Sequence, residues 1–64
     1  MSYSEKLVVL RGERTRAEVA AAIGISQSAL AMYETGRRMP RDEIKVLLAQ
    51  FFETTVGHLF FNQE

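Results

Sequence analysis

The sequence predicts an all-α fold, a compact bundle of five helices in a single domain that spans residues 1–64. Apolar residues recur at the three- and four-residue spacing of helices, and no segment alternates as a strand would. Residues that end helices stand at the breaks in this pattern, namely Gly12, Gly24, Gly36 and Pro40. The connections are only a few residues long, as in helices that pack in sequence order.

The first two helices are defined by their N-terminal caps. The first is expected over residues 4–11, with Ser4 as its N-cap. The second is expected over residues 16–23 and begins at a capping box, in which Thr15 and Glu18 satisfy each other's backbone N–H groups.

The remaining helices follow similar signals. Gly24 fits the left-handed conformation that ends a helix, and Ser26 then caps a third helix over residues 27–35. A fourth helix is expected from residue 41 or 42 to residue 52, with an acidic first turn that suits the helix dipole. A short fifth helix is expected to start at Thr55 as its N-cap.

The second and third helices together predict a helix-turn-helix. Small or apolar side chains face a common core at Val19, Ala20, Ile23, Ile25, Leu30 and Tyr33. The opposite face of the third helix exposes Gln27, Ser28, Ala31, Met32 and Thr35. This arrangement is typical of an element that reads DNA.

The formal net charge is zero, but the charges are unevenly distributed along the chain. Residues 11–41 carry six arginines against three glutamates, a net charge of +3, whereas residues 42–64 have a net charge of −3. Arginine suits bidentate contacts to phosphate or guanine. The basic segment is therefore expected to meet nucleic acid, the alternative being a solvated charged surface.

Other classes of protein find no support in the sequence. There is no cysteine, and His58 has no second ligand candidate at metal spacing. No glycine-rich phosphate loop, nucleophile elbow or histidine-based triad is present, so we expect no enzyme activity, no metal and no cofactor. Neither a signal peptide nor a membrane span is evident, and we expect a cytoplasmic protein.

Six short motifs follow one another in order: LR at 10–11, TRAEVA at 15–20, IGIS at 23–26, YETGRRMP at 33–40, LLAQFF at 47–52 and TVGHLFF at 55–61. In this order and spacing they resemble the DNA-binding domain of the lambda repressor/Cro-type helix-turn-helix family, also called XRE-like. The resemblance covers almost the whole chain. It implies a lambda-repressor-like fold in which the start of the third helix enters the DNA major groove.

The resemblance implies that the third helix reads bases. Glutamine can pair with adenine and serine with either class of base, so Gln27 and Ser28 are expected to contact base edges. The alternative is that both are only polar residues at a helix start. Ala31 and Met32 lie further along the same face and can contact thymine methyl groups, although Met32 fits the edge of the core equally well.

Polar residues around the third helix are expected to bind phosphates and to set the register of the complex. Arg16, Arg37 and Arg38 are assigned this role, and Thr35 is expected to add a hydroxyl or backbone contact. Arg41 enters the fourth helix, from which it can reach the DNA backbone or a narrow minor groove.

The resemblance also implies a structural pair. Arg11 and Glu34 match positions at which family members pair an arginine of the first helix with a glutamate near the end of the third, which orients the reading helix. The chain departs from the family pattern at three positions. Arg16 stands where glutamine is usual, Glu53 where a helix-ending glycine is common, and Gly57 where an acidic residue is common.

An apolar cluster near the C-terminus is larger than a short helix on a small domain is expected to hide. Its members are Val56, Leu59, Phe60 and Phe61. We expect it to form the interface of a symmetric homodimer, which would present two reading helices to an inverted-repeat operator. The alternative is that the cluster folds back onto Leu7, Val8 and Leu10 of its own chain.

These features predict a sequence-specific double-stranded DNA-binding transcriptional regulator. We expect a dimeric repressor of the phage or mobile-element type, or a restriction–modification controller, with no membrane association and no small-molecule ligand. The alternative is a protein-binding adaptor or an antitoxin component that uses the same fold. Salt-dependent binding to random duplex DNA distinguishes the regulator from the adaptor.

Overall fold

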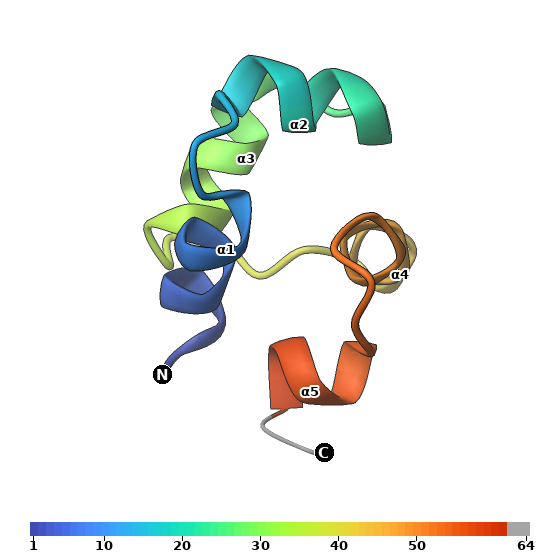
Figure 1. Cartoon of the computed structure of the whole chain (residues 1–64). Helices are drawn as coiled ribbons and strands as arrows, with labels where there is room; N and C mark the ends of the chain where they lie inside the picture. Colours follow the sequence, from blue (N-terminus) through green and yellow to red (C-terminus); the bar gives the residue numbers. More distant parts are fainter. Residues whose placement is uncertain (62–64) are drawn as a thin grey trace.

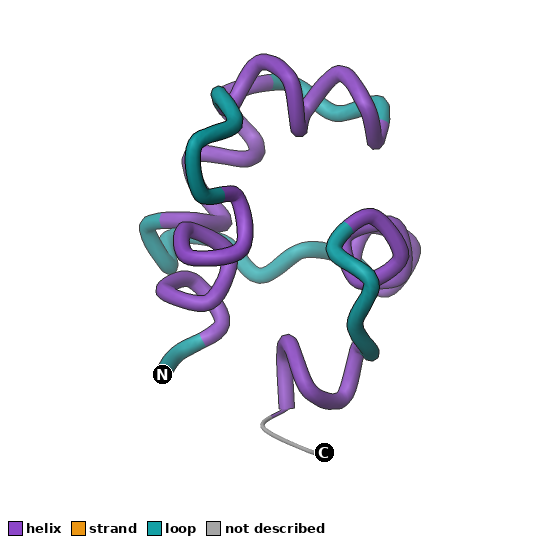
Figure 2. Tube along the Cα trace, in the orientation of Figure 1, coloured by secondary structure: helices purple, strands orange, loops and turns teal. Residues whose placement is uncertain are grey.

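The computed structural model describes residues 1–61, which contain five helices joined by short loops and no strand (Figures 1 and 2). The helices are α1 (Tyr3–Arg11), α2 (Arg16–Ile23), α3 (Gln27–Glu34), α4 (Asp42–Phe51) and α5 (Val56–Phe61). The predicted all-α fold is therefore confirmed. Glu64, one of the acidic residues of the segment 42–64, lies outside the described residues.

The start of α1 differs from the prediction, because Ser2 and not Ser4 is its N-cap. The Ser2 hydroxyl accepts a hydrogen bond from the Glu5 backbone N–H at 3.2 Å, and the Glu5 carboxylate accepts one from the Ser2 backbone N–H at 2.9 Å. This complete capping box is available only when the N-cap lies two residues earlier, at Ser2. The hydrogen bonds from the Ser2 backbone and hydroxyl lower the pKa of Glu5.

The caps of the second and third helices lie where the sequence predicts them. Thr15 accepts from the Glu18 backbone N–H at 3.1 Å, and Ser26 accepts from the Ala29 backbone N–H at 3.0 Å. The capping box at α2 is only half formed, however. The Glu18 carboxylate accepts from the Thr15 hydroxyl at 3.3 Å and not from its backbone N–H.

Four residues with a positive φ follow the first four helices, and two of them, Gly24 and Glu53, bear on the predictions. Gly24 has φ +78° after α2, as predicted, and glycine adopts that conformation without strain. Glu53 has φ +56° after α4, at the position where the family commonly has glycine. Thr55 then caps α5 by accepting from the His58 backbone N–H at 3.0 Å, which confirms the predicted start of this helix.

The core draws one fully buried side chain from each helix: Leu7, Val19, Leu30, Leu48 and Leu59. Helices α1 and α2 both pack on α3, while α4 and α5 pack on each other. Contacts of α1 with α5 and of α2 with α4 close the two halves around this core (Figure 1). The helix-turn-helix therefore packs on α1 through α3 and on α4 through α2, while part of α3 stays exposed to solvent.

The expected dimer cluster is largely internal. Leu59 is fully buried and Phe60 is 8% exposed, with its ring centroid 5.7 Å from that of Tyr3. The expectation that these two side chains form an intermolecular surface is wrong, because α1 and α4 both pack on α5 and cover them. Phe61 remains 54% exposed and Val56 is half-buried.

Candidate nucleic-acid interface

A three-residue turn sets α3 against α2. The backbone N–H groups of Gly24 and Ile25 both bind the carbonyl oxygen of Ala20, and Ile25 packs partly buried against the core. Ala20 itself is buried where the two helices meet. On α3, Leu30, Tyr33 and Glu34 are buried and Ala29 packs partly buried against the core, whereas the other side chains are exposed or half-buried.

The outward face of α3 carries the residues expected to read bases. Gln27 and Ser28 are exposed in its first turn, and Ala31 is half-buried. Met32 is 43% exposed, so it is not a core side chain. The side of the helix beyond them is hollowed over about 420 Å³, with Ala31, Met32, Thr35 and Arg37 as its lining. The exposed face of α3 is therefore concave over the second half of the helix and the start of the loop that follows it.

The loop after α3 presents Arg37 and Arg38, both exposed. Their backbone N–H groups donate to the Met32 carbonyl oxygen at 3.0 and 3.4 Å, respectively. The Tyr3 phenol donates to the Arg38 carbonyl oxygen at 2.9 Å. The backbone of this arginine pair is thus fixed from two sides while both side chains reach solvent.

Thr35 is less available than the sequence suggests. Its backbone N–H donates to the Ala31 carbonyl oxygen at 3.0 Å, and its hydroxyl donates to the same oxygen at 2.8 Å. Phosphate oxygens only accept hydrogen bonds. A phosphate contact by Thr35 would therefore require its hydroxyl to rotate away from the helix.

A buried carboxylate lies where α1 and α3 end and α2 begins. The Glu34 side chain is 1% exposed, and Arg11 binds it through Nε–Oε2 at 2.7 Å and Nη2–Oε1 at 3.2 Å. Arg16 binds the same carboxylate through Nε–Oε1 at 2.8 Å. The contact of Arg11 with Glu34 is the one that the family resemblance implied.

The Arg16 contact with Glu34 was missed at the sequence level. The available signal was the arginine itself, which replaces the usual glutamine at the first position of α2. An arginine at this position can bind Glu34 together with Arg11. Whether it lies close enough depends on the distance between the start of α2 and the end of α3, which follows only from the fold.

Two further arginines differ in surroundings. The Arg14 guanidinium lies over the rings of Phe51 and Phe52, 5.2 and 6.0 Å from their centroids, and so ties the α1–α2 connection to the end of α4. Arg41 is the exposed N-cap residue of α4, and its side chain makes no cap hydrogen bond. Among residues 1–61, Arg14 therefore has aromatic partners, whereas Arg41 is exposed and has neither an aromatic nor an ionic partner.

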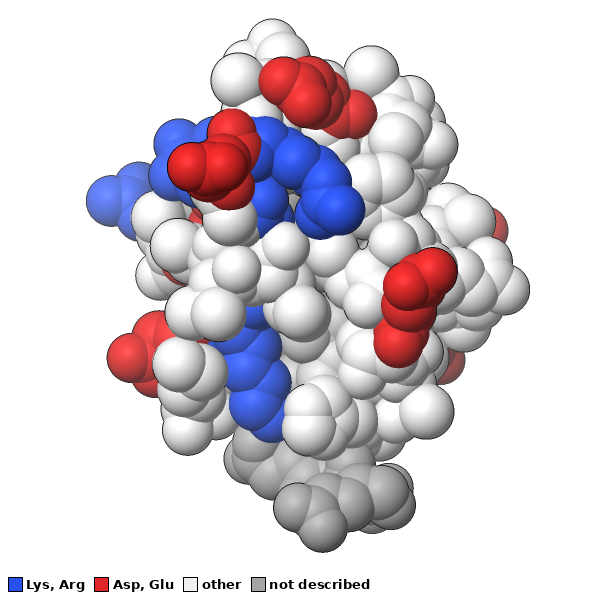
Figure 3. Space-filling view, viewed as in Figure 1, with Lys and Arg blue, Asp and Glu red and all other residues white. Residues whose placement is uncertain are grey.

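Basic side chains are unevenly distributed over the face of the molecule that Figure 3 draws. On the face shown in Figure 3, basic side chains gather over the end of α1 and the start of α2, with acidic groups beside them. In the same view a second, smaller basic patch lies lower down, toward α5, and separate acidic groups lie to either side of it. The largest basic area on this face is therefore the one around the α1–α2 connection.

Other kinds of site are not found within the part of the chain that the structure describes. Residues 1–61 contain no group of three or more His, Cys, Asp or Glu side chains that could hold a metal ion. In the same range no helix is both long enough and apolar enough to span a bilayer.

Comparison with known proteins identifies the family. The profile of a family described as helix-turn-helix matches residues 9–59, which include all of α2, α3 and α4 and the arginine loop. No curated protein and no solved structure matches this chain. With most of its length matched, the chain belongs to the helix-turn-helix family of the lambda repressor/XRE type.

Proposed function

We propose that this DNA-binding helix-turn-helix protein is a sequence-specific transcriptional regulator that reads double-stranded DNA with α3. One observation carries the proposal. The polar first turn of α3 and the adjoining hollow are exposed, and exposed arginines lie both at the start of α2 and in the loop after α3. A helix start flanked by cations suits a major groove between two phosphate backbones.

In this proposal Gln27 and Ser28 contact base edges, and Ala31 and Met32 contact thymine methyl groups. The exposure of Gln27, Ser28 and Met32 on α3 supports the assignment. Met32 in particular lines the hollow beside the helix, where an apolar group of a base could pack.

The phosphate contacts are assigned to Arg16, Arg37, Arg38 and Arg41. All four side chains are exposed, and Arg37 and Arg38 sit on a loop whose backbone is hydrogen-bonded to α3 and to Tyr3. A backbone fixed in this way allows charged side chains to set the register of the complex.

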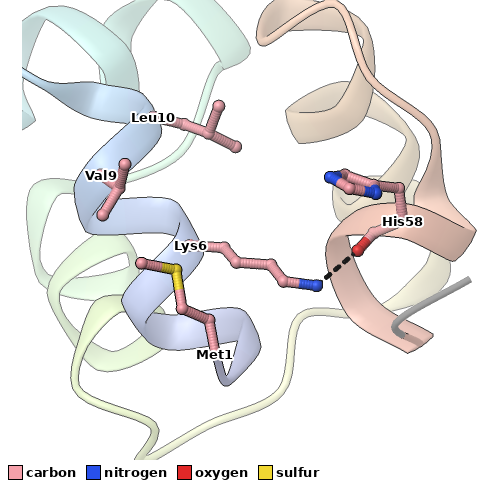
Figure 4. Close-up of a pocket in the computed structure, with 5 residues that line it drawn as sticks. All are labelled: Met1, Lys6, Val9, Leu10 and His58. Carbon is pink, nitrogen blue, oxygen red and sulfur yellow. Dashed lines mark hydrogen bonds between the residues drawn. The ribbon is translucent and has the colours of Figure 1, made fainter. Parts of the chain in front are cut away.

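We further propose that the protein acts as a cytoplasmic homodimeric repressor on an inverted repeat. With Leu59 and Phe60 buried, the interface is assigned to Phe61 and to the apolar surface of α1. Figure 4 shows this surface, where Lys6 reaches from α1 to the His58 carbonyl oxygen at 2.7 Å. A hollow of about 210 Å³ opens there, lined by Met1, Lys6, Val9, Leu10 and His58, and is called the α1–α5 hollow below.

Binding to random duplex DNA at increasing salt tests the proposed function. A regulator that neutralises several phosphates should lose affinity steeply, with a linear fall of log K against log salt. A pool selection at low salt should then recover a preferred sequence. Salt-independent or undetectable binding to duplex DNA would contradict the proposal and favour an adaptor that uses the same fold.

A further inference from the structure

The buried Glu34 carboxylate joins the ends of three helices. Arg11 is the last residue of α1, Arg16 the first of α2 and Glu34 the last of α3. A carboxylate that is 1% exposed is destabilising unless it is paired and hydrogen-bonded, and two guanidinium groups supply its partners here.

The two arginines around this carboxylate are used differently. Arg11 is 19% exposed and has all three guanidinium nitrogens bonded, with Nε and Nη2 on Glu34 and Nη1 on the Arg14 carbonyl oxygen at 2.9 Å. Arg16 is 44% exposed and touches Glu34 only through Nε. Among residues 1–61 its Nη1 and Nη2 groups make no other hydrogen bond.

This difference between the two arginines determines which of them exposes the positive charge of the Arg11–Arg16–Glu34 cluster to solvent. Two guanidinium groups and one carboxylate leave a net charge of +1. Because Arg11 is mostly covered and fully bonded, the excess charge is presented to solvent by Arg16. The two unbonded amino groups of Arg16 match the two-pronged contact that a phosphate accepts.

We propose that Glu34 is a positioning residue for DNA binding, which holds Nε of Arg16 so that Nη1 and Nη2 are presented to a backbone phosphate. The inference rests on the proposed function. It explains how the Arg16 side chain is oriented for its proposed phosphate contact before DNA binds. An arginine that is already ordered in the unbound protein loses less conformational freedom on binding. Since Glu34 also ends α3, it ties this phosphate contact to the position of the reading helix.

A double-mutant cycle on DNA affinity tests the proposal. Arg16→Ala, Glu34→Gln and the double variant are compared with the wild type on the duplex recovered by pool selection. Glu34→Gln should raise the dissociation constant for DNA by one factor in the wild-type background and by a smaller factor in the Arg16→Ala background. We expect the first factor to be at least about three times the second. Additive effects, or tighter binding by Glu34→Gln in the presence of Arg16, would overturn the proposal.

Arg37 supplies the matched control. It is an exposed arginine that is assigned a phosphate contact, but it has no ion pair among the described residues. A cycle of Glu34→Gln with Arg37→Ala should be additive. Equal coupling in both cycles would show that Glu34→Gln acts through a general loss of fold, and would overturn the assignment to Arg16.

Arg16→Lys keeps the proposal testable if Glu34→Gln fails to fold. Lysine has the same charge but a single terminal nitrogen, which cannot face Glu34 and a phosphate in the way that an arginine fork does. Thermal unfolding should stay close to that of the wild type, while DNA affinity should fall although the charge at residue 16 is retained. Wild-type affinity in Arg16→Lys would overturn the proposal.

The wild type in the same assay separates the two levels of inference. Absence of salt-dependent binding to DNA would contradict the proposed function and with it the role of Glu34. Salt-dependent binding together with additive cycles would leave the proposed function standing and remove only the positioning role.

Discussion

The phenol of Tyr3, the first residue of α1, donates a hydrogen bond to the carbonyl oxygen of Arg38 at 2.9 Å, across 35 positions of sequence. The ring of the same tyrosine packs against Phe60 in α5. Tyr3 therefore connects the start of α1 both to the last helix and to the loop that carries two of the proposed phosphate contacts. The position of that loop depends on a residue far from it in sequence.

Tyr3→Phe should remove this hydrogen bond and keep the ring packing. We expect a loss of about 0.5–1.5 kcal/mol in the free energy of unfolding, the usual net contribution of one hydrogen bond. Urea denaturation measures it. Amide exchange at Arg37 and Arg38 should also become faster relative to α3. Unchanged stability and unchanged exchange would show that the bond does not hold the loop.

Glu53→Gly should stabilise the protein. Glu53 has φ +56°, a conformation that a side-chain-bearing residue adopts at a cost and glycine does not. Because glycine also makes the unfolded chain more flexible, we expect a net gain of only about 0.5–1 kcal/mol. Glu53→Ala is the control: it removes the same charge but keeps the strain, so a gain of equal size there would contradict the explanation.

The sequence predicted those parts of the fold that depend on neighbouring residues. Gly24, Ser26 and Thr55 end or begin helices through contacts within a few positions, and all three do so in the structure. The start of α1 was assigned to Ser4 although Ser2 forms the complete box with Glu5. That error arose because two serines near one another can each cap a helix, and only the glutamate three positions later distinguishes them.

The sequence could not predict the features that depend on packing between distant helices. The burial of Phe60 follows from the placement of α1 and α4 around a six-residue helix, which no local pattern determines. The second arginine on Glu34 likewise requires the start of α2 to lie beside the end of α3. The Arg11 contact with Glu34 was foreseen only through the family resemblance.

Gln27→Ala should relax sequence specificity. Loss of a bidentate contact to a base should weaken binding to the best site by about 1–3 kcal/mol and remove the preference at one position in each half-site. Affinity for a panel of single-base variants of the selected duplex measures both effects. Gln50→Ala on α4 is the matched control, because it removes an exposed glutamine outside the proposed interface. A uniform loss across the panel would reassign Gln27 to the DNA backbone.

Val9→Asp should favour the monomer. Val9 is 60% exposed and lines the α1–α5 hollow, so the substitution leaves the core intact but would place an unpaired charge in the proposed interface. Sedimentation at micromolar concentration should show a dimer for the wild type and a monomer for the variant. Val46→Asp, at an exposed valine of α4, should remain dimeric. A wild type that is monomeric both alone and on a full operator would contradict the dimer.

The most direct measurement for the central claim is a map of the amide chemical-shift changes that DNA causes in isotope-labelled protein. Titration with the selected duplex should perturb the start of α3 at Gln27 and Ser28, the start of α2 at Arg16 and the loop at Arg37 and Arg38. The amides of α4 beyond its first turn should change least. Shifts confined to α4 and α5, with none in α3, would contradict the account that this helix reads DNA.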